Sequence, residues 1–391
     1  MTVLPDQRTG HVVADDVLVR LRDLCVDGGL GDLAATMEGL AGFVREDLAS
    51  VEDELAAVST CGTMGDTLVG KAGTNLVSLG GKRLRPLCVV LAARIGLAPA
   101  AAVRDIAVAA ELVHNATLLH DDVVDHADRR RGRPTARVEL GNAASIFAGD
   151  YLLIEALQRV QRAGVPGVMD GLLATIAEMI RAESLQLENR GRLDTSEELY
   201  FEVARGKSAS LFRWALGGGA LAGGASAEHH AALEAYGESV GVAFQLVDDL
   251  LDLVGHHSNT GKTLFSDLSE GKVTFPLITV LAHEPELVDT IRAIASDHSV
   301  FGNGDEAHSG NGTANGDGMT NGDGDAGAGP GVGRRQKRVL EAMARHGVEE
   351  TCRGLAATYV DRGIAALANI PDGEARRALI AVARASVLRE R

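Results

Sequence analysis

Residues 243–255 read AFQLVDDLLDLVG, and this stretch decides the fold. Apolar residues run through the whole segment, and three carboxylates, those of Asp248, Asp249 and Asp252, interrupt them. The spacing i, i+1, i+4 places these side chains on or beside one helix face, with Gln245 one turn earlier on the same stripe. Three acids in an otherwise apolar helix would be a costly core defect without compensation. We therefore interpret this stretch as a helix that holds cations at its polar face.

A second stretch, residues 114–132, reads HNATLLHDDVVDHADRRRG. It repeats the same spacing with Asp121, Asp122 and Asp125. Carboxylates this close repel one another unless cations lie between them, and oxygen ligands of this kind suit Mg²⁺, which also binds substrate phosphates. By itself the motif could equally be a solvated acidic helix end. Two such clusters on separate apolar helices predict two carboxylate walls that hold several Mg²⁺ ions.

The rest of the chain indicates an all-α fold. Alanine and leucine dominate the apolar residues and only 3% of residues are aromatic, a mix that favours helix over sheet. Apolar residues recur at three- and four-residue spacing, Gly or Pro marks the breaks, and no alternating strand pattern of useful length appears. The predicted helices span 36–59, 62–79, 86–96, 101–125, 143–163, 166–190, 196–222, 228–254, 273–283, 285–297, 335–346, 348–369 and 373–390.

We expect one helical domain over residues 31–391, preceded by an N-terminal extension over residues 1–30. Residues 301–333 are almost wholly Gly, Asn, Asp, Ala, Ser and Thr. Such a run cannot bury enough apolar area to offset the entropy lost on ordering. It is therefore expected to be a flexible surface insertion between two helices.

The net charge of −16 argues against nucleic acid as a partner, because phosphate backbones require clustered Lys and Arg. Acidic residues can still bind small phosphorylated substrates through metal ions. We see no signal peptide and no apolar stretch long enough to span a bilayer, and four scattered cysteines fit reduced thiols. We expect a cytoplasmic protein without stable membrane insertion, with at most peripheral contact for product release.

Basic residues accompany both acidic stretches. GGKRLRP at residues 80–86 places Lys82 and Arg85 at the start of a predicted helix, a natural anion site. Arg130 and Arg131 follow the first acidic cluster, and arginine binds phosphate oxygens through a fork of donors. Either group could instead form a solvated turn or pair with nearby carboxylates. Four further side chains are weak signals one at a time: His114, Lys207, Lys262 and Lys272.

Together these segments resemble the trans-prenyltransferase family, the head-to-tail polyprenyl diphosphate synthases. GGKRLRP, HDDVVD with the RRG after it, GKSASL, FQLVDDLLD and DLSEGKVTFP stand in the family's order at similar separations. The likeness covers residues 36–300 and resumes after the insertion. GNAASIFAGDYLL, residues 141–153, looks most like members that make long chains. The resemblance implies a single large bundle of the isoprenoid synthase type, with a deep central cavity and the carboxylates at its mouth.

The resemblance also implies roles for single residues. Lys82, Arg85 and His114 would hold the diphosphate of isopentenyl diphosphate, helped by Arg131. The residues expected to contact the allylic diphosphate or to support the aspartates are Arg130, Lys207, Gln245 and Lys262, with Lys272 near the closed allylic site. Lys207 would join the six aspartates as the catalytic set.

One position departs from the family pattern. Phe265 stands in GKTLFSDL where the family often has glycine. The loop around Lys262 is therefore expected to differ in shape.

The expected reaction joins isopentenyl diphosphate to an allylic diphosphate. Three Mg²⁺ ions would clamp the allylic diphosphate between the two clusters, so that its carbon–oxygen bond can ionise. An apolar pocket would keep water from the allylic cation until the isopentenyl double bond attacks, and a proton is then lost. By the same likeness we expect a homodimer.

Product length is expected to depend on residues beneath the first acidic cluster, namely Val113, Ala116 and Thr117. In this family large aromatic residues there mark short-chain enzymes, and both Ala116 and Thr117 are small. The prediction is a product longer than farnesyl.

Three alternatives remain open at this point. A geranylgeranyl diphosphate synthase would share all of these motifs. A terpene cyclase would carry an Asn/Ser/Glu metal motif in place of the second cluster and would not need GGKRLRP. A non-catalytic subunit of a heteromeric synthase would be expected to have lost one acidic cluster, and both are intact here.

Overall fold

The computed structural model describes residues 31–61, 65–78, 81–96, 102–130, 132–255, 264–299 and 332–387. In this part of the chain every regular element is helical except one hairpin, in which β1 (Arg129–Arg130) pairs antiparallel with β2 (Arg133–Pro134). The predicted all-α fold is therefore confirmed. The predictions for residues 1–30 and 301–331 lie outside the described residues.

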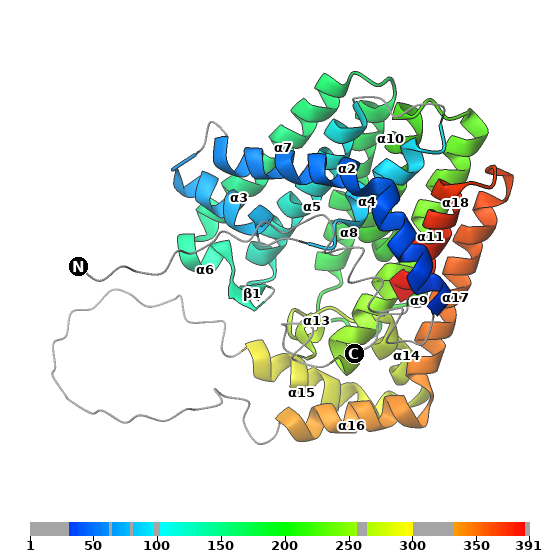
Figure 1. Cartoon of the computed structure of the whole chain (residues 1–391). Coiled ribbons are helices and arrows are strands. Elements are labelled where there is room, and N and C mark those ends of the chain that lie inside the picture. Colours follow the sequence, from blue (N-terminus) through cyan, green and yellow to red (C-terminus); the bar gives the residue numbers. More distant parts are fainter. Residues whose placement is uncertain are drawn as a thin grey trace, which may run out of the picture.

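The bundle contains both long and short helices (Figure 1). Those before the hairpin are α2 (Gly31–Cys61), α3 (Leu68–Ser78), α4 (Leu84–Ala93) and α5 (Ala102–Val124). Those that follow it are α6 (Ala136–Leu140), α7 (Asn142–Ala163), α8 (Val168–Glu188), α9 (Glu197–Ala204), η1 (Arg205–Ala209), α10 (Ser210–Ala222) and α11 (Ala227–Val254). The remainder are α13 (Ser266–Ser269), α14 (Phe275–His283), η2 (Pro285–Leu287), α15 (Val288–Ser299), α16 (Val332–Arg345), α17 (Val348–Ala366), η3 (Leu367–Asn369) and α18 (Glu374–Val387).

The two acidic stretches lie on α5 and α11. Helix α5 packs against α4, α7 and α10, whereas α11 packs against α10, α17 and η1. A Cβ atom at Gly241 would lie 2.5 Å from Cα of Ala209, so the missing side chain lets α11 approach η1 closely. The packing thus places the second acidic helix directly beside the turn that carries Lys207.

Several helix boundaries differ from the prediction by a few residues. Helix α3 begins at Leu68 and not at 62, because the Thr67 hydroxyl accepts a hydrogen bond from the Gly70 N–H (3.1 Å) and caps the helix there. The predicted helix over 196–222 is interrupted by η1, a π-helical turn that residue spacing does not reveal. Helix α16 begins at Val332, inside the predicted insertion. Gly333 in its first turn has a low helix propensity, so the composition does not indicate a start there.

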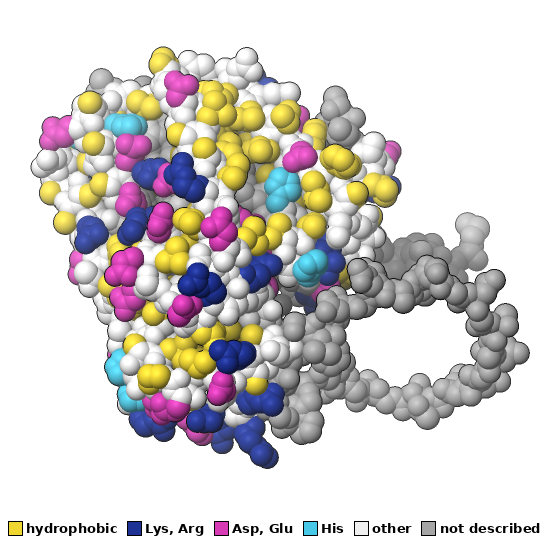
Figure 2. All heavy atoms as spheres, turned by 180° about the vertical axis from the view of Figure 1, so that it is seen from behind, with side chains coloured by type: hydrophobic (Ala, Val, Ile, Leu, Met, Phe, Trp, Pro, Cys, Tyr) yellow, Lys and Arg dark blue, Asp and Glu magenta, His cyan; other side chains and the backbone are white. Residues whose placement is uncertain are grey.

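Helices α7 and α8 leave apolar side chains exposed. Figure 2 shows hydrophobic side chains gathered over the upper part of the face seen there. The exposed large hydrophobic residues of these two helices are Ile146, Phe147, Ile154, Leu173, Ile180 and Leu187. On α8 they recur every seventh residue, which aligns them on one helix face. Among the described helices, none is both long and apolar enough to cross a bilayer. We refer to the six exposed residues as the α7–α8 stripe.

Candidate active site

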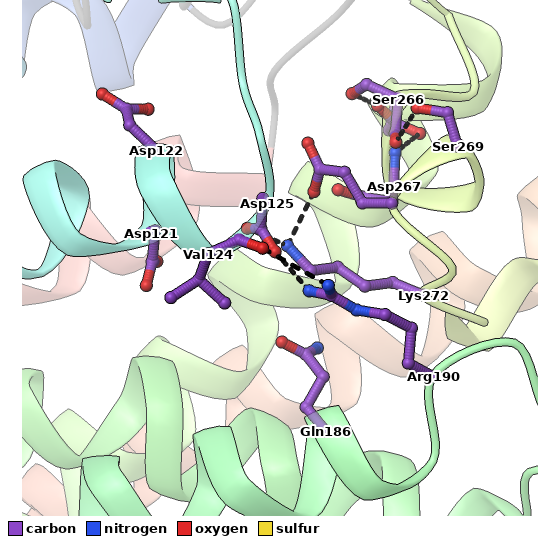
Figure 3. Close-up of polar contacts among 12 residues, drawn as sticks. Asp121, Asp122, Val124, Asp125, Gln186, Arg190, Ser266, Asp267, Ser269 and Lys272 are labelled. Atoms are coloured by element: carbon purple, nitrogen blue, oxygen red, sulfur yellow. Dashed lines mark hydrogen bonds and ion pairs between the residues drawn. The ribbon is translucent and has the colours of Figure 1, made fainter. Parts of the chain in front are cut away.

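Asp125 lies just beyond the last residue of α5 and is gripped from two sides (Figure 3). Lys272 Nζ lies 2.6 Å from its Oδ2, and Arg190 Nη2 lies 2.6 Å from its Oδ1. Lys272 also contacts Glu270 Oε2 at 2.7 Å. Burial would raise the pKa of Asp125, but the charges of Lys272, Lys207 and Arg190 outweigh it and lower that pKa. Asp125 is therefore a carboxylate that already binds positive charge.

Asp121 lies one turn earlier and faces Lys207 of η1. Lys207 Nζ lies 3.4 Å from Asp121 Oδ2, 2.5 Å from Glu183 Oε2 and 3.2 Å from Gln186 Oε1. Burial would lower the pKa of Lys207, yet the surrounding carboxylates raise it, so its ammonium group stays charged. The π-helical turn η1, which holds Gly206 against Ala182 of α8, aims this ammonium at the first acidic cluster.

Asp122 is turned away from this face and is buried. Arg130 of strand β1 donates from Nε to Asp122 Oδ1 at 2.8 Å. The hairpin thus folds back onto the helix end that precedes it. Arg130 therefore pairs with a neighbouring carboxylate, which was one of the two interpretations that the sequence left open.

In the second cluster, Asp249 is buried and fully engaged. Tyr200 Oη donates to its Oδ2 and Gln245 Nε2 to its Oδ1, both at 2.6 Å. Burial, together with the nearby Asp267 charge, raises the pKa of Asp249 to about 7, although both hydrogen bonds act in the opposite direction. Asp248 remains half-buried on the same turn.

The segment after α11 connects the two clusters. Asp252 accepts hydrogen bonds from the Ser266 hydroxyl and from the Asp267 N–H, the latter at 3.2 Å. The Lys272 N–H in turn donates to the Asp267 carbonyl at 2.8 Å, while Lys272 Nζ reaches Asp125. Residues 264–272 therefore contact both acidic clusters.

Phe265 begins this connecting segment with a left-handed backbone, φ +63°. Its ring is fully buried, and its N–H donates to the Asp252 carbonyl at 2.9 Å. The position thus keeps the conformation that glycine adopts readily, and burial of the ring offsets a strain of about 1–2 kcal/mol. The expected change of loop shape at Lys262 lies outside the described residues, as does Arg131.

The GGKRLRP segment is anchored by Arg83, which lies between the two residues predicted to bind substrate. Its guanidinium is buried and donates to Glu52 Oε1 and Glu111 Oε1, each at 2.7 Å. Lys82 is exposed, and the Arg85 guanidinium stacks over the Phe212 ring at 4.6 Å. The anchor therefore fixes the backbone that presents Lys82 and Arg85.

The remaining predicted residues lie along α5. His114 and Thr117 are half-buried, and the Thr117 hydroxyl donates to the His114 carbonyl at 2.8 Å. Val113 and Ala116 are buried. All four lie on the stretch of α5 that precedes the first acidic cluster.

The sequence reasoning missed several side chains of this site. Arg190, Glu183 and Gln186 come from α8 and the turn after it, and Tyr200 comes from α9. Glu183 and Gln186 stand three residues apart on one face of α8, and Arg190 follows four residues later in the turn after it, a spacing that the sequence contained. In the described part of the chain, no three acidic, histidine or cysteine side chains lie close enough to share one metal ion. In the first cluster, lysines and arginines contact the carboxylates.

The family described as polyprenyl synthetase matches residues 66–301, which is more than half of the chain. The chain belongs to the polyprenyl synthetase family. This synthetase is 37% identical over 327 residues to the octaprenyl diphosphate synthase of Escherichia coli K12, covering 83% of this chain and 91% of the relative. It is 39% identical over 250 residues to heptaprenyl diphosphate synthase component 2 of Geobacillus stearothermophilus, covering 63% of this chain and 77% of the relative.

A solved structure agrees with these relatives. The polyprenyl synthase from Caulobacter crescentus CB15, complexed with calcium and isoprenyl diphosphate, matches the synthetase with a TM-score of 0.76 and 30% identity. The match covers 90% of this chain and 97% of that chain. The predicted family, the bundle of the isoprenoid synthase type and the prenyltransferase activity are therefore confirmed.

Proposed function

We propose that this polyprenyl synthetase condenses isopentenyl diphosphate with an allylic diphosphate and releases a product longer than farnesyl diphosphate. The observation that carries the proposal is the segment 264–272, which binds Asp252 at one end and Asp125 at the other. One substrate diphosphate can therefore contact both acidic clusters through shared cations.

The acidic side chains fit Mg²⁺ by their chemistry, because all of them offer carboxylate oxygens and two of them, Asp121 and Asp125, already pair with cationic groups. We propose Asp121, Asp125, Asp248 and Asp252 as its ligands. When bound, Mg²⁺ would neutralise charge on the departing diphosphate. The number of three ions stays a prediction.

Asp122 and Asp249, also predicted as ligands, are proposed to support the site from the interior. Arg130 engages Asp122, and Asp249 accepts hydrogen bonds at both carboxylate oxygens. Their role is then to fix the C-terminal ends of α5 and α11, so that the half-buried carboxylates beside them point into the site.

We assign the basic residues to the two substrates in two groups. Lys207 and Lys272 lie beside the first cluster, where they would donate to the allylic diphosphate as its carbon–oxygen bond breaks. Lys82, Arg85 and His114 would hold isopentenyl diphosphate so that its double bond attacks the allylic cation. The released diphosphate takes up the proton that the new product loses.

Purified protein is tested with Mg²⁺, isopentenyl diphosphate and each allylic primer in turn, and the dephosphorylated products are sized by chromatography. Chains longer than C15 from any primer support the proposal. Turnover that persists in excess chelator, or no condensation with any primer, contradicts it.

Product length provides a prediction of its own. Ala116→Phe places an aromatic ring at a buried position of α5 beneath the first cluster, so we expect the longest product to shorten. Because overpacking a core costs about 1–3 kcal/mol, Thr117→Phe at the neighbouring half-buried position serves as a second variant. Products of both variants are sized by chromatography, and an unchanged length in two folded variants would remove the chain-length assignment.

We propose a homodimer through the α7–α8 stripe. A second copy presents the same stripe, and a two-fold axis makes such a surface self-complementary. Ile180, with a relative exposure of 65%, lies at the middle of the α8 row. We expect Ile180→Asp to convert a dimer to a monomer in light scattering, whereas Leu68→Asp, at an exposed position of α3, leaves the mass unchanged.

A heteromeric synthase is the second candidate assembly, because one relative is named as component 2 of its enzyme. In that case the isolated chain would be inactive with every primer and monomeric before any substitution. Both clusters are intact in the sequence, which argues against a non-catalytic subunit.

A further inference from the structure

Arg190, in the turn after α8, belongs to neither acidic cluster and to none of the basic motifs in the sequence. We propose that Arg190 is a positioning residue that orients the Asp125 carboxylate for metal binding and links it to the segment that carries Lys272. This inference rests on the proposed function.

The first support is the way its fork grips the end of α5. Arg190 Nη2 contacts Asp125 Oδ1 at 2.6 Å, and Nη1 donates to the Val124 carbonyl at 3.3 Å. One planar group thus holds both the side chain and the adjacent backbone of the same turn, as Figure 3 shows. Lys272 holds the other oxygen of Asp125, so the carboxylate plane is fixed from two directions.

The second support is the fit between the Arg190 turn and Gly271. The Gly191 N–H donates to the Gly271 carbonyl at 2.8 Å. Gly271 has φ +79°, and a Cβ atom there would lie 2.5 Å from Cγ of Arg190. The backbone before Lys272 therefore closes over the aliphatic part of Arg190. Three segments distant in sequence meet at this one side chain.

This geometry leaves Asp125 free to bind a metal ion without losing Arg190. A carboxylate offers about four lone-pair sites, and the two basic side chains use one on each oxygen. Partners that orient a metal ligand from behind typically change metal affinity or activity by about 10–100-fold when removed. A lysine at this position supplies charge at one point and cannot grip Asp125 and the Val124 carbonyl together.

The experiment compares Arg190→Met and Arg190→Lys with Arg192→Met as the matched control. Arg192 lies two residues on, has a side chain that is 58% exposed, and pairs with the exposed Asp194. Two quantities are measured for each protein. One is the Mg²⁺ concentration that gives half-maximal turnover; the other, which needs no turnover, is the rise in thermal midpoint when MgCl₂ and inorganic diphosphate are added to metal-free protein.

We expect both Arg190 variants to raise the half-saturating Mg²⁺ concentration by about tenfold and to show a smaller thermal rise at fixed Mg²⁺. The KM for isopentenyl diphosphate should stay within twofold, and Arg192→Met should match the wild type. If Arg190→Met lowers only the metal-free midpoint, Arg190 is a structural link and the proposal is overturned. If Arg190→Lys matches the wild type, charge suffices and the fork assignment is overturned.

These outcomes are separable from the fate of the proposed function. A wild-type protein that condenses no primer would contradict the synthase proposal. The thermal rise with MgCl₂ and inorganic diphosphate would still compare Arg190→Met with Arg192→Met. An equal rise in those two variants would overturn the role of Arg190 whatever the enzyme makes.

Discussion

Asp121→Asn and Asp248→Asn are each expected to lower kcat by at least about 10³-fold at saturating Mg²⁺. Each change keeps the size of the side chain but removes the charge that would hold a divalent ion against the departing diphosphate, a contribution worth several kcal/mol. Lys207 keeps Glu183 and Gln186 as partners when Asp121 is changed, so the fold should survive. Incorporation of labelled isopentenyl diphosphate measures the rate, and circular dichroism checks the fold.

The double variant separates one shared site from two independent ones. If both carboxylates act on one diphosphate, combining Asp121→Asn with Asp248→Asn should cost little more than the worse single change. Asp128→Asn is the matched control. This exposed aspartate lies three residues beyond Asp125 and pairs with Arg137. More than a tenth of wild-type turnover in Asp248→Asn would show that the second cluster takes no part in ionisation.

Arg83→Met is expected to lower the free energy of unfolding by about 3–5 kcal/mol, the largest stability effect we foresee. The change removes a buried guanidinium that bridges α2 and α5 and also donates to the Val77 carbonyl at 3.2 Å. Glu111, which is only 2% exposed, would be left as a buried charge without this partner. Urea unfolding followed by circular dichroism measures the difference.

The identity of the lost interaction can be tested by a second substitution. Adding Glu111→Leu to Arg83→Met replaces the buried pair with apolar groups and should recover part of the lost stability. Arg377→Met is the control for an exposed ion pair with Asp372 and should change stability by less than about 0.5 kcal/mol. A loss below about 1 kcal/mol in Arg83→Met would mean that the buried network does not anchor the GGKRLRP segment.

The fold could be predicted because apolar residues repeat at three- and four-residue spacing over long stretches, and this pattern indicates a helix. The two acidic stretches occur on α5 and α11 as the spacing of their aspartates and apolar residues indicates. Elements shorter than about two turns contain no full period, so the hairpin β1–β2 and helices α6 and α13 could not be read from the sequence. The π-helical turn η1 was hidden for a related reason, since it inserts its extra residue within a continuous helical pattern.

Site residues that are charged members of a motif could be predicted from the sequence. Their partners from distant parts of the sequence could not. Lys207 and Lys272, which the sequence motifs had singled out, lie against the first cluster, and their roles at the allylic diphosphate stay predictions. The distinction between Asp121, which faces the basic residues, and Asp122, which is buried, depends on the hairpin that brings Arg130 back. Tyr200 reaches Asp249 across 49 residues of sequence, and no local pattern announces such a contact.

Helices α15 and α16 pack against each other although α15 ends at Ser299 and α16 begins only at Val332. Because the two helices pack against each other, their contact does not depend on the length of the segment that joins them in sequence. The entropy of closing a loop rises only with the logarithm of its length, by about 0.6 kcal/mol for each doubling. Evolution can therefore lengthen or shorten this joint freely, and relatives with a brief turn here can share the same catalytic architecture.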